Sequence, residues 1–277
     1  MITEKEKRSH LIGRGYCVFD QVLTSDMLDR VKQVSDRLLD AQDADHFEAQ
    51  KSTGSLICVY EDSFFSELIA WQPALDILHA MGFDRPTFST GFVISKPPQS
   101  PPLFWHQDWW GWNDPVSYRP MPQQTFLMYY LVDTTPANGC LRLIEGSHLK
   151  RHPVHDVVPD AHTDDLRRVT DPDHPAYQSH AGEIDVPVRA GDLVIGDARL
   201  LHSAHANKTD RRRTVITLWY HPCYDDLPQG MQVRLSRHKL PEHWPEEARD
   251  RVTPLMPKYE GDASELEWNR IPGKALL

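Results

Sequence analysis

Cysteine is scarce in this chain of 277 residues, which contains only Cys17, Cys58, Cys140 and Cys223. The four are far apart and form no C-x-x-C pair, so their spacing indicates neither a thiolate zinc site nor a disulfide framework. We expect reduced thiols, and therefore a cytoplasmic protein.

Long apolar runs are also missing. No stretch approaches the roughly 18 consecutive apolar residues that indicate a membrane-spanning helix. The N-terminal run M-I-T-E-K-E-K-R-S-H is charged and lacks the apolar segment of a signal peptide. We therefore predict that the protein has no membrane partner.

Positive charge is in the minority, because 30 Lys and Arg stand against 40 Asp and Glu, for a formal net charge of −10. Nucleic-acid binding requires clustered Lys and Arg. The one basic run, Arg211-Arg212-Arg213, is short. We predict no nucleic-acid partner and expect a small-molecule substrate instead.

Strand-like runs separated by turn residues dominate the middle of the chain. They lie at 87–95, 103–108, 124–132, 193–203 and 213–220, with Gly, Pro, Asn and Asp between them. Short strands with such turns predict a β-sandwich or barrel covered by helices on one face. Apolar residues at helical spacing predict one helix after Thr24 or Ser25 and another over 64–80, interrupted near Pro73.

We predict one domain over residues 1–277, with core strands between about 87 and 222. Residues 149–185 are polar and rich in His and Asp, and they form a long insertion suited to be a lid over a site. Residues 225–277 are rich in Pro and charge and form a C-terminal extension.

Two residues with metal-ligating side chains stand close together in the run L-F-W-H-Q-D-W-W. Side chains at i and i+2 of a strand share a face, so His106 and Asp108 can hold one ion. His202, in the apolar run A-R-L-L-H-S-A, offers a third ligand. Two imidazoles and one carboxylate form the facial triad of non-haem Fe(II), which leaves positions open for O₂ and a co-substrate.

Other interpretations of these histidines stay open at this point. With 15 His residues, an H-x-D pair can arise by chance. His205, three residues after His202, competes for the third position, and a His-x-x-His pair also suggests zinc.

Four runs give the chain a resemblance to a known family. They are I-S-K-P-P before the site, W-H-Q-D, N-G-C-L-R-L-I-E-G-S-H at 138–148 and H-S-A-H-A-N-K-T-D-R-R-R at 202–213. In order and spacing they resemble the phytanoyl-CoA dioxygenase superfamily of Fe(II)/2-oxoglutarate-dependent oxygenases. The resemblance implies a mainly β fold with flanking helices (α+β) around a double-stranded β-helix, the jelly-roll or cupin-like core. It also implies Fe(II), 2-oxoglutarate and O₂ as cofactors.

The resemblance also assigns roles to individual residues. Its distal motif places the ligand His five residues before an Asn, which selects His202 before Asn207. It places an Arg eleven residues after that His, which assigns Arg213 to the far carboxylate of 2-oxoglutarate. Many relatives have Ser or Thr two residues after the His, where this chain has Ala204. Gln107 and Met128 match positions at which relatives contact the co-substrate. Thr217 is expected to share the strand face of Arg213 and to contact the co-substrate as well.

The function that this implies is a hydroxylase acting on an unactivated C–H bond of a small metabolite, with release of succinate and CO₂. Related halogenases lack the carboxylate that Asp108 provides, so its presence favours hydroxylation over halogenation. Four aromatic residues are predicted to contact the substrate, namely Trp105, Trp109, Trp110 and Trp219. Three arginines could meet an acidic group on it, namely Arg119, Arg142 and Arg199.

Two alternatives remain. One is a cupin-type metalloenzyme that does not use 2-oxoglutarate and would not need Arg213. The other is a catalytically inactive family member that binds a metal or ligand.

Overall fold

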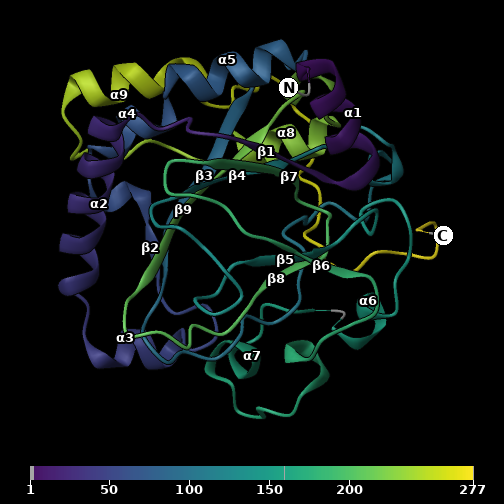
Figure 1. Ribbon diagram of the computed structural model, residues 1–277. Helices are drawn as coiled ribbons and strands as arrows, with labels where there is room; N and C mark the ends of the chain where they lie inside the picture. Colours follow the sequence, from purple (N-terminus) through teal and green to yellow (C-terminus); the bar gives the residue numbers. More distant parts are fainter. Residues whose placement is uncertain (1–2, 159, 277) are drawn as a thin grey trace.

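The computed structural model describes residues 3–158 and 160–276 (Figure 1). Its two sheets are antiparallel throughout. The larger has the order β1 (Tyr16–Phe19), β7 (Leu193–Asp197), β4 (Thr125–Tyr130), β9 (Arg213–His221), β3 (Thr87–Lys96), β2 (Leu56–Cys58). The smaller has the order β6 (Glu183–Val186), β5 (Leu141–Ile144), β8 (His202–Ala204). This confirms the mainly β, jelly-roll fold with flanking helices.

Helices surround the larger sheet on its outer side. In Figure 1, α1, α2, α4, α5 and α9 lie around it, whereas α6 and α7 lie near the smaller sheet. The bounds are α1 Glu4–Arg14, α2 Ser25–Asp40, α3 Ala44–Ala49, α4 Phe65–Ile69, α5 Gln72–Ala80, α6 Val154–Val157, α7 Asp164–Arg168, α8 Gln229–Leu235 and α9 Glu246–Val252.

Local sequence explains two of these helices. Thr24 caps α2, because its hydroxyl accepts a hydrogen bond from the backbone N–H of Met27 at 3.2 Å. Pro73 stands in the first turn of α5, where no backbone N–H is needed. The interruption expected near Pro73 is thus the break between α4 and α5.

Side chains along β4 and β9 point alternately to the two faces of the larger sheet, and each face packs against a different part of the interior. Leu127, Tyr129, Ile216 and Leu218 belong to the core cluster shared with the helices. Their neighbours on the opposite face pack with the smaller sheet, and they include Phe126, Met128, Tyr130 and Val215. Because side chains alternate between faces of a strand, the residues of β9 that share a face with Arg213 point between the two sheets.

Two expected strands differ from the structure. Residues 103–108 form no strand, but only an isolated bridge between His106 and His202. Four prolines at 97–102 precede this segment, and the N–H of Trp105 bonds to the carbonyl of Ala176 instead of to a strand. The expected strand 193–203 is two strands in different sheets, since the chain turns after Asp197.

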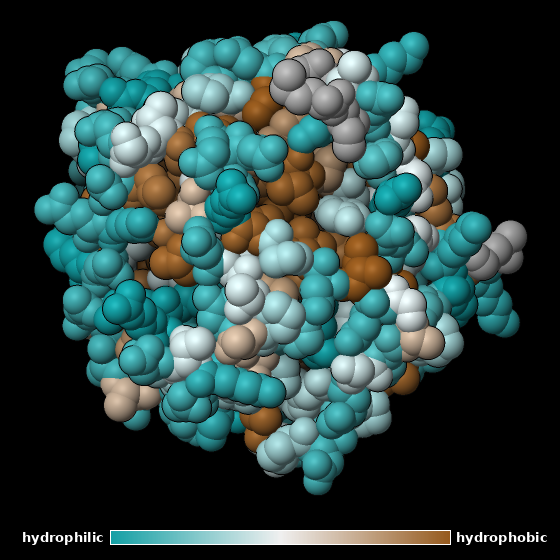
Figure 2. Space-filling view, in the orientation of Figure 1, coloured by the Kyte–Doolittle hydropathy of each residue, from teal (hydrophilic) through white to brown (hydrophobic). Residues whose placement is uncertain are grey.

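The two outer segments carry little regular structure beyond short elements. Residues 149–185 contain α6, α7 and the start of β6, and residues 225–277 contain α8 and α9. The tail returns to the site, where Asn269 forms a bridge with Gly111. None of the helices in the described ranges is both long enough and apolar enough to cross a membrane. In Figure 2, apolar residues gather in the upper part of this face, with hydrophilic residues around them.

Candidate active site

His106 and His202 face each other across two reciprocal backbone hydrogen bonds. His106 N–H donates to the His202 carbonyl at 3.0 Å, and His202 N–H donates back at 2.9 Å. The two imidazole centroids are 4.1 Å apart. The isolated bridge thus achieves the side-by-side placement that a regular strand pair would have given.

Both imidazoles are oriented in the same way. Nδ1 of His106 donates to the carbonyl of Phe104 and Nδ1 of His202 to that of Leu200, each at 3.0 Å. This tautomer leaves the lone pair on Nε2, and a backbone carbonyl behind the ring is the usual support of a metal-binding histidine. The two Nε2 atoms lie 3.6 and 3.7 Å from the carboxylate oxygens of Asp108.

Asp108 is fixed by contacts of its own. Its N–H donates to the carbonyl of Ala198 at 2.8 Å, and its Oδ2 accepts from Trp219 Nε1 at 2.9 Å. Two Nε2 lone pairs and one carboxylate therefore converge, and this donor set fits a divalent iron ion.

Burial favours the neutral form of His106. It lowers the pKa of the His106 imidazole to about 3, and the neighbouring His202 contributes to the same direction. A neutral imidazole is the form that binds a metal ion, so His106 needs no deprotonation at physiological pH.

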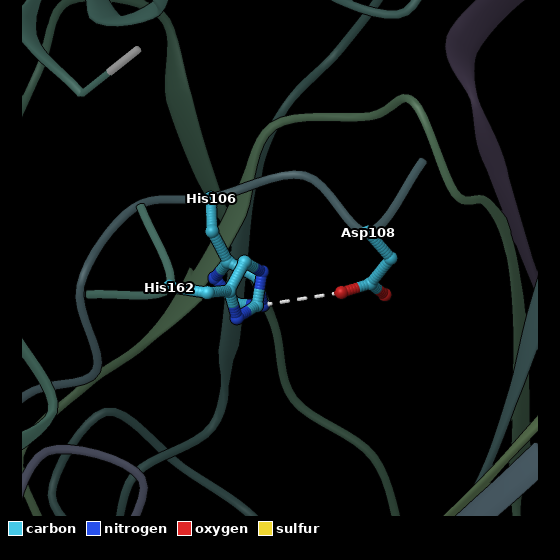
Figure 3. A group of neighbouring side chains, drawn as sticks. All are labelled: His106, Asp108 and His162. Atoms are coloured by element: carbon cyan, nitrogen blue, oxygen red, sulfur yellow. Dashed lines mark ion pairs between the residues drawn. The ribbon is translucent and has the colours of Figure 1, made fainter. Parts of the chain in front are cut away.

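A third histidine, His162, lies next to His106 and near Asp108 (Figure 3). Its ring centroid is 5.0 Å from that of His106, and ligand atoms of His106, Asp108 and His162 all lie within 4.8 Å of one another. His162 comes from the 149–185 segment, and its Nε2 is 3.4 Å from the carbonyl of Gln107. Sequence reasoning missed it, because the polar segment around it has no pattern that singles it out.

His205 points elsewhere. Its Nε2 is 2.6 Å from Oδ1 of Asp185, and the pair lies beside Cys140. This geometry favours His202 over His205 as the third ligand.

A cavity of about 640 Å³ extends from His106, Asp108 and His202 between the sheets. At one end lie Arg213 and Thr217, which are 4% and 0% exposed. Arg213 Nε and Thr217 Oγ1 are buried without a hydrogen-bond partner in the described part of the chain. Met128 also lines this end. An anion that accepts hydrogen bonds, such as the far carboxylate of 2-oxoglutarate, fits these unpartnered donors.

Lys96 adds a second cation there. It is 1% exposed, lines the cavity, and is the cross-strand partner of Arg213 between β3 and β9. Its Nζ donates to the carbonyls of Ser52 and Pro101 at 2.8 and 2.5 Å. Burial lowers the pKa of Lys96 well below its ordinary value, and the charge of Arg213 adds to the effect. The I-S-K-P-P run contains this residue, but sequence reasoning gave it no role.

The expected substrate residues divide into two groups. Trp110 and Trp219 line the cavity, whereas Trp105 and Trp109 are fully buried in other clusters. Their indole N–H groups donate to the carbonyl of Gln178 and the hydroxyl of Ser117. We therefore keep the substrate-contact hypothesis for Trp110 and Trp219 only.

Gln107 also points away from the cavity, since its Nε2 donates to the Arg270 carbonyl at 2.9 Å. The three arginines considered for an acidic group do not line the cavity either. Arg199 is paired with Asp197, Arg142 donates to Ser203 and the carbonyl of Tyr177, and Arg119 is exposed. The arginines that do line it, besides Arg213, are Arg167, Arg234 and Arg270.

Comparison with known proteins places the chain in a family. The profile of phytanoyl-CoA dioxygenase (PhyH) matches residues 13–215. Phytanoyl-CoA dioxygenase 1 of Oryza sativa subsp. japonica is 28% identical over 147 residues, which are 51% of this chain and about half (47%) of that protein. Ectoine dioxygenase of Sphingopyxis alaskensis is 23% identical over 237 residues, covering 80% of this chain and 77% of the relative.

A solved structure agrees with the fold. The epimerase SnoN from nogalamycin biosynthesis, in complex with Fe³⁺, alpha-ketoglutarate and nogalamycin RO, superposes with a TM-score of 0.59 at 19% identity and covers 97% of both chains. The fold and the match together relate the chain to the class of Fe(II)/2-oxoglutarate-dependent oxygenases. The chain belongs to the phytanoyl-CoA dioxygenase family, whose cofactors are Fe(II), 2-oxoglutarate and O₂.

Proposed function

We propose that this protein hydroxylates an unactivated C–H bond of a small organic metabolite while 2-oxoglutarate is converted to succinate and CO₂. One observation carries the proposal: a three-residue ligand set opens into the same cavity as two buried cations that have no carboxylate partner among the described residues. A metal site alone would not require the cations.

In this proposal His106, Asp108 and His202 hold the iron, which supplies activation of O₂ when it is bound. Arg213 and Lys96 bind the far carboxylate of 2-oxoglutarate, with the Thr217 hydroxyl as a further donor. The buried position of these groups excludes water from the charge pair, which strengthens it. Trp219 holds Asp108 in its ligating orientation through the 2.9 Å hydrogen bond.

The substrate occupies the rest of the cavity. Phe92, Trp110 and Trp219 give it an apolar wall, and the segment 149–185 brings His162 to its edge. We propose that this segment covers the site as a lid in a single domain spanning residues 1–277, and that the protein acts in the cytoplasm.

One relative favours a second outcome of the same chemistry. The structure with a TM-score of 0.59 is that of an epimerase. Epimerisation by this chain would consume 2-oxoglutarate and O₂ without adding oxygen to the product, and the two electrons that hydroxylation takes from the substrate would come instead from an added reductant such as ascorbate.

Product analysis under ¹⁸O₂ separates the two. Purified protein with Fe(II) and 2-oxoglutarate is screened against small metabolites by succinate release, and each product is analysed by mass spectrometry. Hydroxylation predicts that the product gains one labelled oxygen. A product that is an isomer of its substrate would show that the reaction is epimerisation and not hydroxylation. If no substrate caused succinate release, the proposal would be contradicted.

A further inference from the structure

The C-terminal tail contributes residues to the cavity that contains the metal ligands. Trp268 and Arg270 both line that cavity with His106 and Asp108. The tail is held to the segment after Asp108, because Asn269 N–H donates to the Trp110 carbonyl at 2.8 Å and Trp112 N–H donates to the Asn269 carbonyl at 3.2 Å. Its placement is therefore specified by backbone contacts.

Arg270 is held by two groups, one at its backbone and one at its guanidinium. Gln107 Nε2 donates to its carbonyl at 2.9 Å, and its guanidinium lies 5.1 Å from the centre of the Trp268 ring. Trp268 in turn stacks on Trp110, with ring centroids 5.3 Å apart and planes 9° from parallel. Such stacking on an aromatic face fixes a guanidinium while leaving its N–H groups free to donate.

One nitrogen of the Arg270 guanidinium lacks a hydrogen-bond acceptor in the described part of the chain. Arg270 Nη1 is buried and makes no hydrogen bond to a described residue, and no Asp or Glu in the described ranges forms an ion pair with it. Burial lowers the pKa of Arg270, whereas the charges of Asp108 and Asp160 oppose that shift. A buried, unpaired donor of this kind is costly unless a ligand supplies the acceptor.

Besides Arg213, two other arginines line the cavity with Arg270, and both are paired with carboxylates. Arg234 pairs with Glu265 at 2.9 Å, and Arg167 pairs with Asp164. Arg213 and Lys96 lie at the co-substrate end. Asp108 does not compensate Arg270 in the loaded protein, because its carboxylate is then committed to the metal. Asp160 also lines the cavity and its charge acts on Arg270, but the two form no ion pair. Among the described residues, Arg270 is thus the cavity arginine outside the co-substrate end that has no ion-pair partner.

We infer that Arg270 binds an acidic group of the organic substrate, a carboxylate or a phosphonate, and that the substrate is an organic anion with an apolar body. The guanidinium fork matches either acid through two parallel hydrogen bonds. The apolar body packs on Phe92, Trp110 and Trp219, which line the same cavity. The inference rests on the proposed function, since it takes the remaining space as a substrate site.

The test compares matched probes that differ in charge. Anaerobic protein loaded with Fe(II) and 2-oxoglutarate is titrated calorimetrically with 3-phenylpropionate, 2-phenylethylphosphonate and 3-phenylpropionamide, and with the naphthyl analogues of all three. The variants are Arg270→Gln, Arg270→Lys and, as a control on another cavity arginine, Arg167→Gln. The visible charge-transfer band of the Fe(II)–2-oxoglutarate complex is recorded for each protein.

We expect an acid to bind the parent about 10- to 100-fold more tightly than its amide, as a charge-assisted hydrogen bond provides. The ratio of acid affinity to amide affinity should fall to about one in Arg270→Gln. It should be partly retained in Arg270→Lys and unchanged in Arg167→Gln. Whichever probe binds more tightly, the carboxylate or the phosphonate, identifies the acidic group that Arg270 prefers. The charge-transfer band persists in all three variants.

Several results overturn the inference. The parent protein could bind acids and amides equally, or bind neither. The acid preference could survive in Arg270→Gln, or it could be lost to the same extent in Arg167→Gln. Loss of the band in Arg270→Gln would instead assign the residue to the metal and 2-oxoglutarate. Absence of the band in the parent is a different failure, because it contradicts the proposed function itself.

Discussion

Lys96 of β3 and Arg213 of β9 are cross-strand partners, and both are almost fully buried. Like charges placed opposite each other on a sheet destabilise it, and these two have no carboxylate partner in the described part of the chain. The arrangement makes sense when an anion lies between them and the iron ligands. The far carboxylate of 2-oxoglutarate is that anion in our proposal.

Removing either cation should weaken co-substrate binding. We expect Arg213→Ala to lower the affinity for 2-oxoglutarate by about 100-fold or more, because a buried charge pair loses one partner. Lys96→Ala should lower it about 10-fold. Calorimetric titration of 2-oxoglutarate into Mn(II)-loaded protein measures both, with the exposed Lys208→Ala as control. Unchanged affinity in Arg213→Ala would remove the co-substrate assignment and favour a metalloenzyme that works without 2-oxoglutarate.

The roles of the neighbouring histidines can be separated by substitution. His202→Ala should abolish tight Fe(II) binding, because it removes one of three ligands. His162→Ala should leave Fe(II) affinity within about threefold, since His162 is outside our ligand set. Competition with a metal-sensitive dye gives both affinities. The reverse order of effects would place His162 in the ligand set instead of His202.

Trp219 should influence the metal through Asp108. Trp219→Phe keeps an aromatic ring but removes the N–H that donates to Asp108 Oδ2. We expect Fe(II) affinity to fall about 10-fold, the lower end of the effect of losing a group that supports a ligand. The same dye competition measures it. Trp110→Phe is the matched control, because Trp110 lines the same cavity and its indole N–H makes no hydrogen bond to a described metal ligand. Equal affinities for both variants would contradict this positioning role.

Arg199 should matter for stability and not for the substrate. Its side chain and that of Asp197 are both fully buried and pair at 2.6 Å, and Arg199 also donates to the carbonyls of Ser117, Arg119 and Met121. Arg199→Ala leaves a buried carboxylate and several carbonyls without donors, so the free energy of unfolding should fall by about 3–5 kcal/mol. Urea denaturation measures this loss, and exposed Arg119→Ala is the control. A loss below about 1 kcal/mol would contradict it.

The sequence predicted the parts of the fold that depend on local periodicity. The strands at 87–95, 124–132 and 213–220 and the helix after Thr24 have strong alternating or helical patterns, and the structure contains each of them. It could not predict that 103–108 is an isolated bridge or that 193–203 belongs to two sheets. Those features depend on partners distant in sequence, such as the carbonyls of Ala176 and Ala198.

The candidate site divides in the same way. His106, Asp108 and His202 were recognisable because their motif spacing is characteristic of a family, and the structure brings them together. Lys96 became apparent only from its burial opposite Arg213, and His162 and Arg270 only from the return of two irregular segments to the cavity. Conversely, Trp105 and Trp109 looked like substrate contacts, because sequence proximity to ligands does not reveal which way a side chain points.

Joint binding of Fe(II) and 2-oxoglutarate in this cavity can be measured by anaerobic titration. Apoprotein is titrated with Fe(II), then with 2-oxoglutarate, while the visible metal-to-ligand charge-transfer band is recorded. We predict a band that requires both components and that is lost in His106→Ala and in Arg213→Ala at moderate 2-oxoglutarate concentration. Correctly folded parent protein that gives no band would contradict the account and support a metal site that does not use 2-oxoglutarate.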